Sequence, residues 1–189
     1  MLEKTVLGFA ALASAAPLQE ATTPAASPVQ YATNCAAPGD PTDRLVCATP
    51  DLLALDRQMA ALVAQVGPLD RKLIEPQAGW LKRRNQCAIE KQPSACVDAA
   101  YRERITVLRT LSAPPAPADG LSCRFPDAGW MQVEIGPELA IVRDGTGKVQ
   151  GIALHREKRS KWHPYLRILD SSKQLRFVLG NYTSYCERS

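Results

Sequence analysis

Residue patterns that enzymes commonly use for catalysis are scarce in this sequence of 189 residues. It has two histidines, His155 and His163, and His163 precedes a proline in a charged stretch with no fixed carboxylate in view. No C-x-x-C pair is present for redox chemistry, and the cysteine spacings match no zinc pattern. The segment 145–147, Gly-Thr-Gly, is too short for a phosphate-binding loop. We therefore expect no enzyme, no metal site and no cofactor.

Apolar runs long enough to cross a bilayer, about 20 residues, are also lacking, so we expect no integral membrane protein. The shorter run VLGFAALASAA follows Lys4, and Ala13-Ser14-Ala15 fits a signal-peptidase site. We interpret residues 1–15 as a signal peptide and expect a periplasmic or secreted protein after cleavage near Ala15. Glu3 is unusual in such a segment, which keeps a wrongly assigned start codon as an alternative. Nucleic acid is not an expected partner of an exported protein.

Composition divides the rest of the chain into two modules. Residues 16–34 are mostly Ala, Pro, Thr, Ser and Gln and predict a disordered lead, because they bury too little apolar surface to offset the entropy of ordering. Residues 113–120, APPAPADG, predict a Pro-rich linker. The modules are therefore residues 35–112 and 121–189. Their cysteines, four and then two, can form disulfides within each module, which supplement a small core: Cys35, Cys47, Cys87 and Cys96, then Cys123 and Cys186.

The first module has the periodicity of helices. Apolar residues recur at spacings of three and four along residues 50–66, after Thr49 as candidate N-cap. A second helical stretch is predicted from about residue 69 to 87, with a kink or restart at Pro76. A third begins near Pro93. Because the connections are short, we expect about three antiparallel helices.

An aromatic residue and an arginine share a helix face at two places in this module. Trp80 and Arg84 are four positions apart, and Tyr101 and Arg104 are three apart. Guanidinium groups stack on aromatic rings, a contact worth roughly 0.5 to 2 kcal/mol. One interpretation is a lock between facing helices. The other is an exposed patch for a protein partner, because these residue types dominate binding hot spots.

The second module changes to the alternating period of strands. Residues 130–136 and 138–145 alternate, DGTGK at 144–148 is typical of a hairpin turn, and further strands follow. We predict a small module of four to six antiparallel strands stapled by Cys123 and Cys186. Together with the helices this gives an α+β fold class. The arrangement resembles small β-barrel inhibitors of C-type lysozyme, as an analogy of architecture only.

An ordered set of residues in the helical module resembles a known family. The set is Cys35, Asp43 four residues before Cys47, LLALD at 52–56, Q-x-x-W-L-x-x-R-x-x-C at 77–87, Cys96, and Y-x-x-R-x-x-x-L at 101–108. From Cys35 to Leu111 it is similar to the N-terminal domain family of the lysozyme inhibitor LprI. The family usually has Glu where Asp43 stands, and often an aromatic residue where Val63 stands.

The resemblance implies a small exported helical domain, and a few family members are associated with inhibition of lysozyme-type muramidases. Besides the four cysteines, the matching residues are Asp56, Trp80, Arg84, Tyr101 and Arg104. The cysteines are read as bridges, with Cys35–Cys47 and Cys87–Cys96 preferred because each closes a short loop; such a bridge is worth roughly 3 kcal/mol. A crossed pairing, in which the cysteines of these two pairs exchange partners and tie helix ends together, stays open.

Two functional hypotheses follow. The first is an exported, non-enzymatic binding protein that contacts a lysozyme or another cell-wall hydrolase through an exposed patch of Trp80, Arg84, Tyr101 and Arg104. Charge argues against a C-type lysozyme, because such enzymes are strongly basic and like charges across an interface cost affinity. Residues 35–112 have 11 basic and 9 acidic side chains, and residues 113–189 have 11 and 8.

The second hypothesis is an envelope structural or stress module in which the same four side chains are buried. Its basic hairpin, HREKRSKWH at 155–163, would contact anionic surface polymers. The candidate contacts are Arg156, Lys158, Arg159 and Lys161. The plain alternative for this run is a solvated loop.

Overall fold

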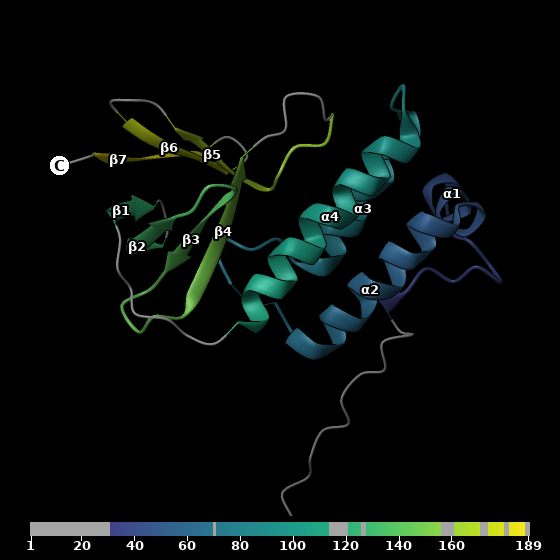
Figure 1. Cartoon of the computed structure of the whole chain (residues 1–189), viewed down its shortest axis with the longest axis horizontal. Coiled ribbons are helices and arrows are strands. Elements are labelled where there is room, and N and C mark those ends of the chain that lie inside the picture. Colours follow the sequence, from purple (N-terminus) through teal and green to yellow (C-terminus); the bar gives the residue numbers. More distant parts are fainter. Residues whose placement is uncertain are drawn as a thin grey trace, which may run out of the picture.

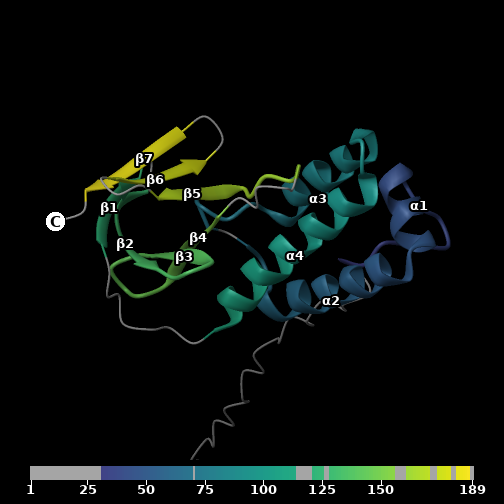
Figure 2. The same ribbon diagram turned by 45° about the horizontal axis from the view of Figure 1, so that its top comes forward.

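The computed structural model describes residues 31–69, 71–113, 121–125, 128–155, 161–170, 174–179 and 182–187. Helices come first in the chain and gather on one side of the molecule, and the strands follow and gather on the other (Figures 1 and 2). The α+β fold class is therefore confirmed. The predicted signal peptide, most of the predicted lead and the linker residues 114–120 lie outside the described residues.

Four α-helices are described rather than about three. They are α1 (Pro41–Ala48), α2 (Pro50–Val66), α3 (Gln77–Asn85) and α4 (Pro93–Ser112), with a short 3-10 helix, η2 (Gln86–Ile89), after α3. The unexpected one is α1. It begins where the Asp40 side chain accepts hydrogen bonds from the backbone N–H groups of Thr42 and Asp43. Thr49, the predicted cap of α2, makes no side-chain capping bond.

The helical stretch predicted for residues 69–87 begins only at Gln77, so that prediction was wrong for residue 69 and residues 71–76. Residues 71–76 instead cross to the β module, where Leu73 forms a parallel bridge with Gly151 and is buried in the core of that module. A Cβ on Gly151 would lie 2.7 Å from the Leu73 Cβ, so the approach requires glycine. Of the kink or restart predicted at Pro76, the structure has the restart, because Pro76 is the N-cap residue of α3.

The apolar stripe predicted along α2 packs against apolar side chains of α4, and the two form the core of the helical module. Leu52 and Met59 of α2 are buried, as are Val97, Ile105 and Leu108 of α4. Gly67, whose φ of 73° suits glycine, ends α2 where the sequence predicted. Periodicity was a reliable guide here because the face that each helix turns toward the other is apolar, although α4 also buries Glu103 and Val107 toward the β module.

Seven strands are described rather than four to six. They are β1 (Leu121–Phe125), β2 (Gly129–Ile135), β3 (Leu139–Arg143), β4 (Val149–His155), β5 (Leu166–Asp170), β6 (Gln174–Leu179) and β7 (Tyr182–Glu187), paired in chain order. Five pairings are antiparallel, but β4 and β5 are parallel, which corrects the all-antiparallel prediction. Parallel neighbours need a crossover. Residues 161–165, which precede β5, lie at the helical module, where Trp162 is part of the core.

The sheet is barrel-like, because its first and last strands lie next to each other (Figure 2). The predicted disulfide joins them: Cys123 of β1 bridges Cys186 of β7, with Cα atoms 4.9 Å apart. Inside, Phe125 and Phe177 pack with ring centroids 5.3 Å apart. The preferred pairings in the helical module, Cys35–Cys47 and Cys87–Cys96, are also present.

The disulfides should differ in their contributions to stability. Cys123–Cys186 closes a segment with a sequence separation of 63, against 12 for Cys35–Cys47. The loss of unfolded-state entropy then predicts that the paired Cys→Ala substitutions lower the free energy of unfolding by about 4 and about 3 kcal/mol respectively. Urea unfolding of the two double variants measures this. A smaller loss at Cys123–Cys186 than at Cys35–Cys47 would contradict the ranking.

Candidate functional site

Trp80, Arg84, Tyr101 and Arg104, the proposed partner-binding patch, are buried side chains between α3 and α4. Both rings are 0% exposed and both arginines are 2% exposed. The hypothesis of an exposed patch is therefore wrong at these residues, and they form the lock between helices. The two rings lie 5.4 Å apart between centroids at 55°, and the Arg104 guanidinium lies 5.8 Å from the Trp80 ring centroid. The structure thus brings the four residues together, but not at the surface.

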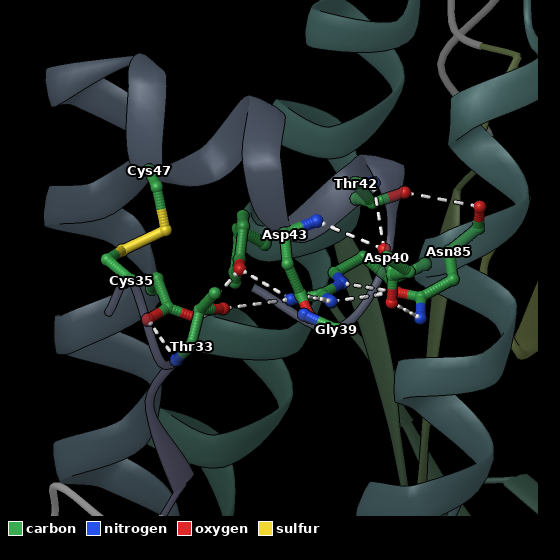
Figure 3. Close-up of polar contacts among 11 residues, drawn as sticks. Thr33, Cys35, Gly39, Asp40, Thr42, Asp43, Cys47 and Asn85 are labelled. Atoms are coloured by element: carbon green, nitrogen blue, oxygen red, sulfur yellow. Dashed lines mark hydrogen bonds and ion pairs between the residues drawn. A yellow bond between two sulfur atoms is a disulfide. The ribbon is translucent and has the colours of Figure 1, made fainter. Parts of the chain in front are cut away.

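A polar network holds the Arg84 guanidinium in this buried position, and Figure 3 labels two of its partners, Asp43 and Asn85. Arg84 Nη2 forms an ion pair with Asp43 Oδ1 at 2.5 Å, and its Nε donates to Asn85 Oδ1 at 3.0 Å. Arg84 Nη1 donates to the Tyr101 hydroxyl at 2.9 Å. A buried guanidinium costs several kcal/mol unless it is paired, so these acceptors are what makes the position tolerable.

The network continues through Tyr101 to the first described residues. The Tyr101 hydroxyl donates to Asp56 Oδ1 at 2.8 Å. Asp56 also accepts from the Thr33 backbone N–H at 2.8 Å and from its hydroxyl at 2.9 Å. Burial raises the pKa of Tyr101, so its hydroxyl keeps its proton. Thr33, which composition assigned to the end of a disordered lead, is thus held against α2, beside the Cys35–Cys47 disulfide (Figure 3).

A second cluster, centred on the half-buried Arg83 of α3, joins the helices to the β module. Arg83 Nη2 forms ion pairs with Glu75 at 2.7 Å and with Glu103 at 3.0 Å. Its guanidinium lies 4.0 Å from the centroid of the Trp162 ring and donates to the His163 carbonyl. Trp162 belongs to the segment that leads into β5, so one arginine side chain connects both modules.

Glu103 completes this cluster from α4. It accepts hydrogen bonds from Trp162 Nε1 and, at 3.1 Å, from the Tyr165 backbone N–H. Burial raises the pKa of Glu103, and the charge and hydrogen bonds of Arg83 oppose that shift. Burial also lowers the pKa of Arg104 to about 10, although Arg104 donates to Gln77 Oε1 and to the Glu75 carbonyl, each at 2.9 Å.

A cleft of about 820 Å³ lies beside this cluster, between α4 and the β module. Its charged lining combines both signs: Asp98, Arg102, Glu103, Glu138 and Lys161. Mixed charges of this kind select no single class of ligand. Lys161 is exposed at this cleft, whereas Arg156, Lys158 and Arg159, the other basic contacts proposed from sequence, lie outside the described residues.

Catalytic groups do not converge in the part of the chain that the structure describes. All six cysteines are in disulfides, and both His155 and His163 are exposed. No group of three potential metal ligands occurs among the described residues. No described helix is long and apolar enough to cross a membrane.

Comparisons with known proteins add no family assignment. No protein-family model, curated protein or solved structure matches this chain. The chemistry of the site therefore has to be argued from its own residues.

The buried network makes a stability prediction for Tyr101→Phe. The substitution removes one partner each from Asp56 and Arg84, so we expect the free energy of unfolding to fall by about 1 to 3 kcal/mol. Tyr185→Phe is the matched control, because that ring is 49% exposed, and it should change stability by less than about 0.5 kcal/mol. Urea unfolding of both variants measures the difference. Equal effects would show that the network does not stabilise the fold.

Exposure of the three tryptophans makes a second prediction. Trp130 is 68% exposed, against 0% for Trp80 and 7% for Trp162. Acrylamide should therefore quench mainly Trp130, and Trp130→Phe should leave emission that resists quenching. Trp80→Phe should instead leave a larger quenchable share. Strong quenching that persists in Trp130→Phe would mean that a second tryptophan is accessible in solution.

Proposed function

We propose that this chain is an exported, non-enzymatic binding protein of the cell envelope whose β module binds anionic surface polymers. In this proposal the helical module is a rigid support. The observation that carries it is the burial of Trp80, Arg84, Tyr101 and Arg104, which removes the exposed patch that the first hypothesis assigned to contact with a hydrolase.

Export is supported by the covalent structure. Three disulfides cross-link the two modules internally, a pattern typical of oxidising compartments. Export also agrees with the signal peptide proposed at residues 1–15. An envelope location would place the protein among polymers that carry phosphate or carboxylate groups.

The distribution of paired charge favours the β module as the binding surface. On the helices, Arg83, Arg84 and Arg102 form ion pairs with acidic side chains of the same module. On the β module, Arg143 pairs with Glu134 at 3.7 Å, and residues 113–189 have 11 basic and 8 acidic side chains. Four of the basic ones that the structure describes are exposed: Arg124, Lys148, Lys161 and Arg176. A net positive surface attracts anionic chains, and the attraction falls with added salt.

The resemblance to the LprI family is compatible with this proposal. Asp56, Trp80, Arg84, Tyr101 and Arg104, the residues it shares with the family, all take part in packing between helices or in the polar contacts around it. If these residues hold the helices together, that role explains why they occur in this order, and no contact with a muramidase is needed to explain it. Inhibition of a basic C-type lysozyme would in addition have to overcome repulsion between like charges.

The proposal predicts salt-sensitive binding to anionic polymers. Purified, fully oxidised protein should bind polygalacturonate and a phosphate-containing wall polymer at low ionic strength, and binding should weaken steadily as salt is added. Neutral dextran serves as the control and should not bind. Isothermal titration calorimetry measures the affinities, and a lysozyme activity assay runs beside it. Inhibition of a muramidase without binding to either polymer would overturn the proposal in favour of the first hypothesis.

A further inference from the structure

Two aromatic side chains and two arginines form a continuous row on the outside of the β module. The members of this aromatic–arginine row are Trp130 of β2, Arg124 of β1, Tyr185 of β7 and Arg176 of β6. Trp130 is 68% and Tyr185 49% exposed, and both arginines are exposed. Their strand neighbours Cys123, Met131, Leu175 and Cys186 are buried. Alternation therefore points all four row members outward.

Strand pairing places the row members side by side. Arg124 is opposite Trp130 in the β1–β2 register, and Arg176 is opposite Tyr185 in the β6–β7 register. Residues directly opposite each other on one face have neighbouring side chains. Each half of the row is thus an aromatic residue next to an arginine.

The disulfide between the first and last strands joins the two halves. Because five strand pairings reverse the chain direction and one does not, β7 runs antiparallel to β1. Cys123 is bonded to Cys186, with Cα atoms 4.9 Å apart. In antiparallel strands the residue after Cys123, Arg124, is then next to the residue before Cys186, Tyr185. The row follows the order Trp130, Arg124, Tyr185, Arg176 across the corner where β1 meets β7.

The row contributes little to the fold and has unused binding capacity. Among the described residues, no ion pair or hydrogen bond engages Arg124 or Arg176. Within the same part of the chain, neither Trp130 nor Tyr185 packs against another ring or a guanidinium. The side chains that fill the barrel interior come from the opposite, inward faces of these strands. A solvent-exposed alternation of tryptophan, arginine, tyrosine and arginine therefore has no packing explanation.

We propose that the aromatic–arginine row is a binding site for an anionic glycan chain, an inference that rests on the proposed function and deepens it. The apolar C–H faces of sugar rings stack on exposed aromatic rings, and the planar guanidinium fork binds carboxylate or phosphate in two hydrogen bonds. With adjacent strands about 4.8 Å apart, Trp130 and Tyr185 are separated by about 10 Å, with Arg124 between them. Alternating rings and charges along one line fit a polymer that alternates sugar rings and acidic groups.

The shape of the surface favours a chain over a folded partner. The row crosses four neighbouring strands, β2, β1, β7 and β6, on the outside of the barrel, and the outer surface of a barrel is convex. Figure 2 shows β1 and β7 next to each other. A rigid globular protein would touch only part of such a line. A flexible polymer can follow the curve and contact all four side chains.

The test uses the full exported chain and two paired variants of the row. Trp130→Ala with Tyr185→Ala removes the stacking surfaces, and Arg124→Gln with Arg176→Gln removes the charges. Ile89→Ala, at a side chain 89% exposed on the helical module, is the control. All row positions are exposed, so each variant should keep the wild-type unfolding midpoint, which is measured first. Titration calorimetry then compares polygalacturonate, polyglutamate, dextran and a single-stranded oligonucleotide.

We expect each row variant to weaken polygalacturonate binding about tenfold or more, equivalent to at least about 1.4 kcal/mol. The control should stay within about twofold of wild type. The aromatic variant should lose the preference for polygalacturonate over polyglutamate, because polyglutamate has charge without sugar rings. In wild type, ligand should also blue-shift or quench emission from Trp130, the exposed tryptophan.

Each other outcome contradicts a defined part of the proposal. Polygalacturonate binding that the row variants leave unchanged overturns the row as the site but keeps the proposed function. Equal affinity of wild type for polyglutamate shows attraction by charge alone and overturns the glycan class. Tighter binding of the oligonucleotide assigns the row to a nucleic acid instead. No binding to any polyanion overturns both this inference and the proposed function.

Discussion

Two consecutive arginines, Arg83 and Arg84, control how the rest of this molecule is assembled. A guanidinium removed from water must be paired, or its desolvation cost exceeds what packing returns. Although they are adjacent on α3, the two side chains contact different parts of the molecule. Arg84 is satisfied within the helical module by Asp43 and Tyr101, and Arg83 is satisfied at the junction by Glu75 and Glu103. Pairing these charges therefore specifies the internal packing of the helices and the position of the β module against them.

The junction explains the departures of the β module from a simple meander. The chain has to bring Trp162 under the Arg83 guanidinium before β5 can begin, so β5 returns parallel to β4 instead of forming a hairpin with it. Leu73, on the connection between α2 and α3, enters the core of the β module beside Gly151. Each module thus covers the surface of the other at this junction. The opposite side of the barrel, where β1 and β7 lie, faces solvent.

The sequence predicted those parts of the fold that depend on local pattern. The helices at residues 50–66 and 93–112 have a one-sided apolar stripe, and the disulfides close within each module. The parts that failed depend on distant partners. α1 has only eight residues and is held by Arg84, which pairs with its Asp43, and by the Asn85 carbonyl, which accepts from Thr42. Residues 71–76 lack helix because Leu73 is used by the β module. Neither partner can be read from the spacing of residues along the chain.

The same limit explains why the sequence pointed to Trp80 and Arg84 as candidate binding residues and not to Trp130 and Arg124. Trp80 with Arg84 and Trp130 with Arg124 are equivalent pairs in residue type, and helical spacing made only the first visible, because the second pair forms across two strands. The two pairs differ in whether the arginine has an acidic partner. Arg84 is neutralised by Asp43 within its own module, whereas the described residues provide no acid for Arg124. Hot-spot composition indicates a binding surface when the arginine lacks an internal partner, and it indicates packing when that partner is supplied.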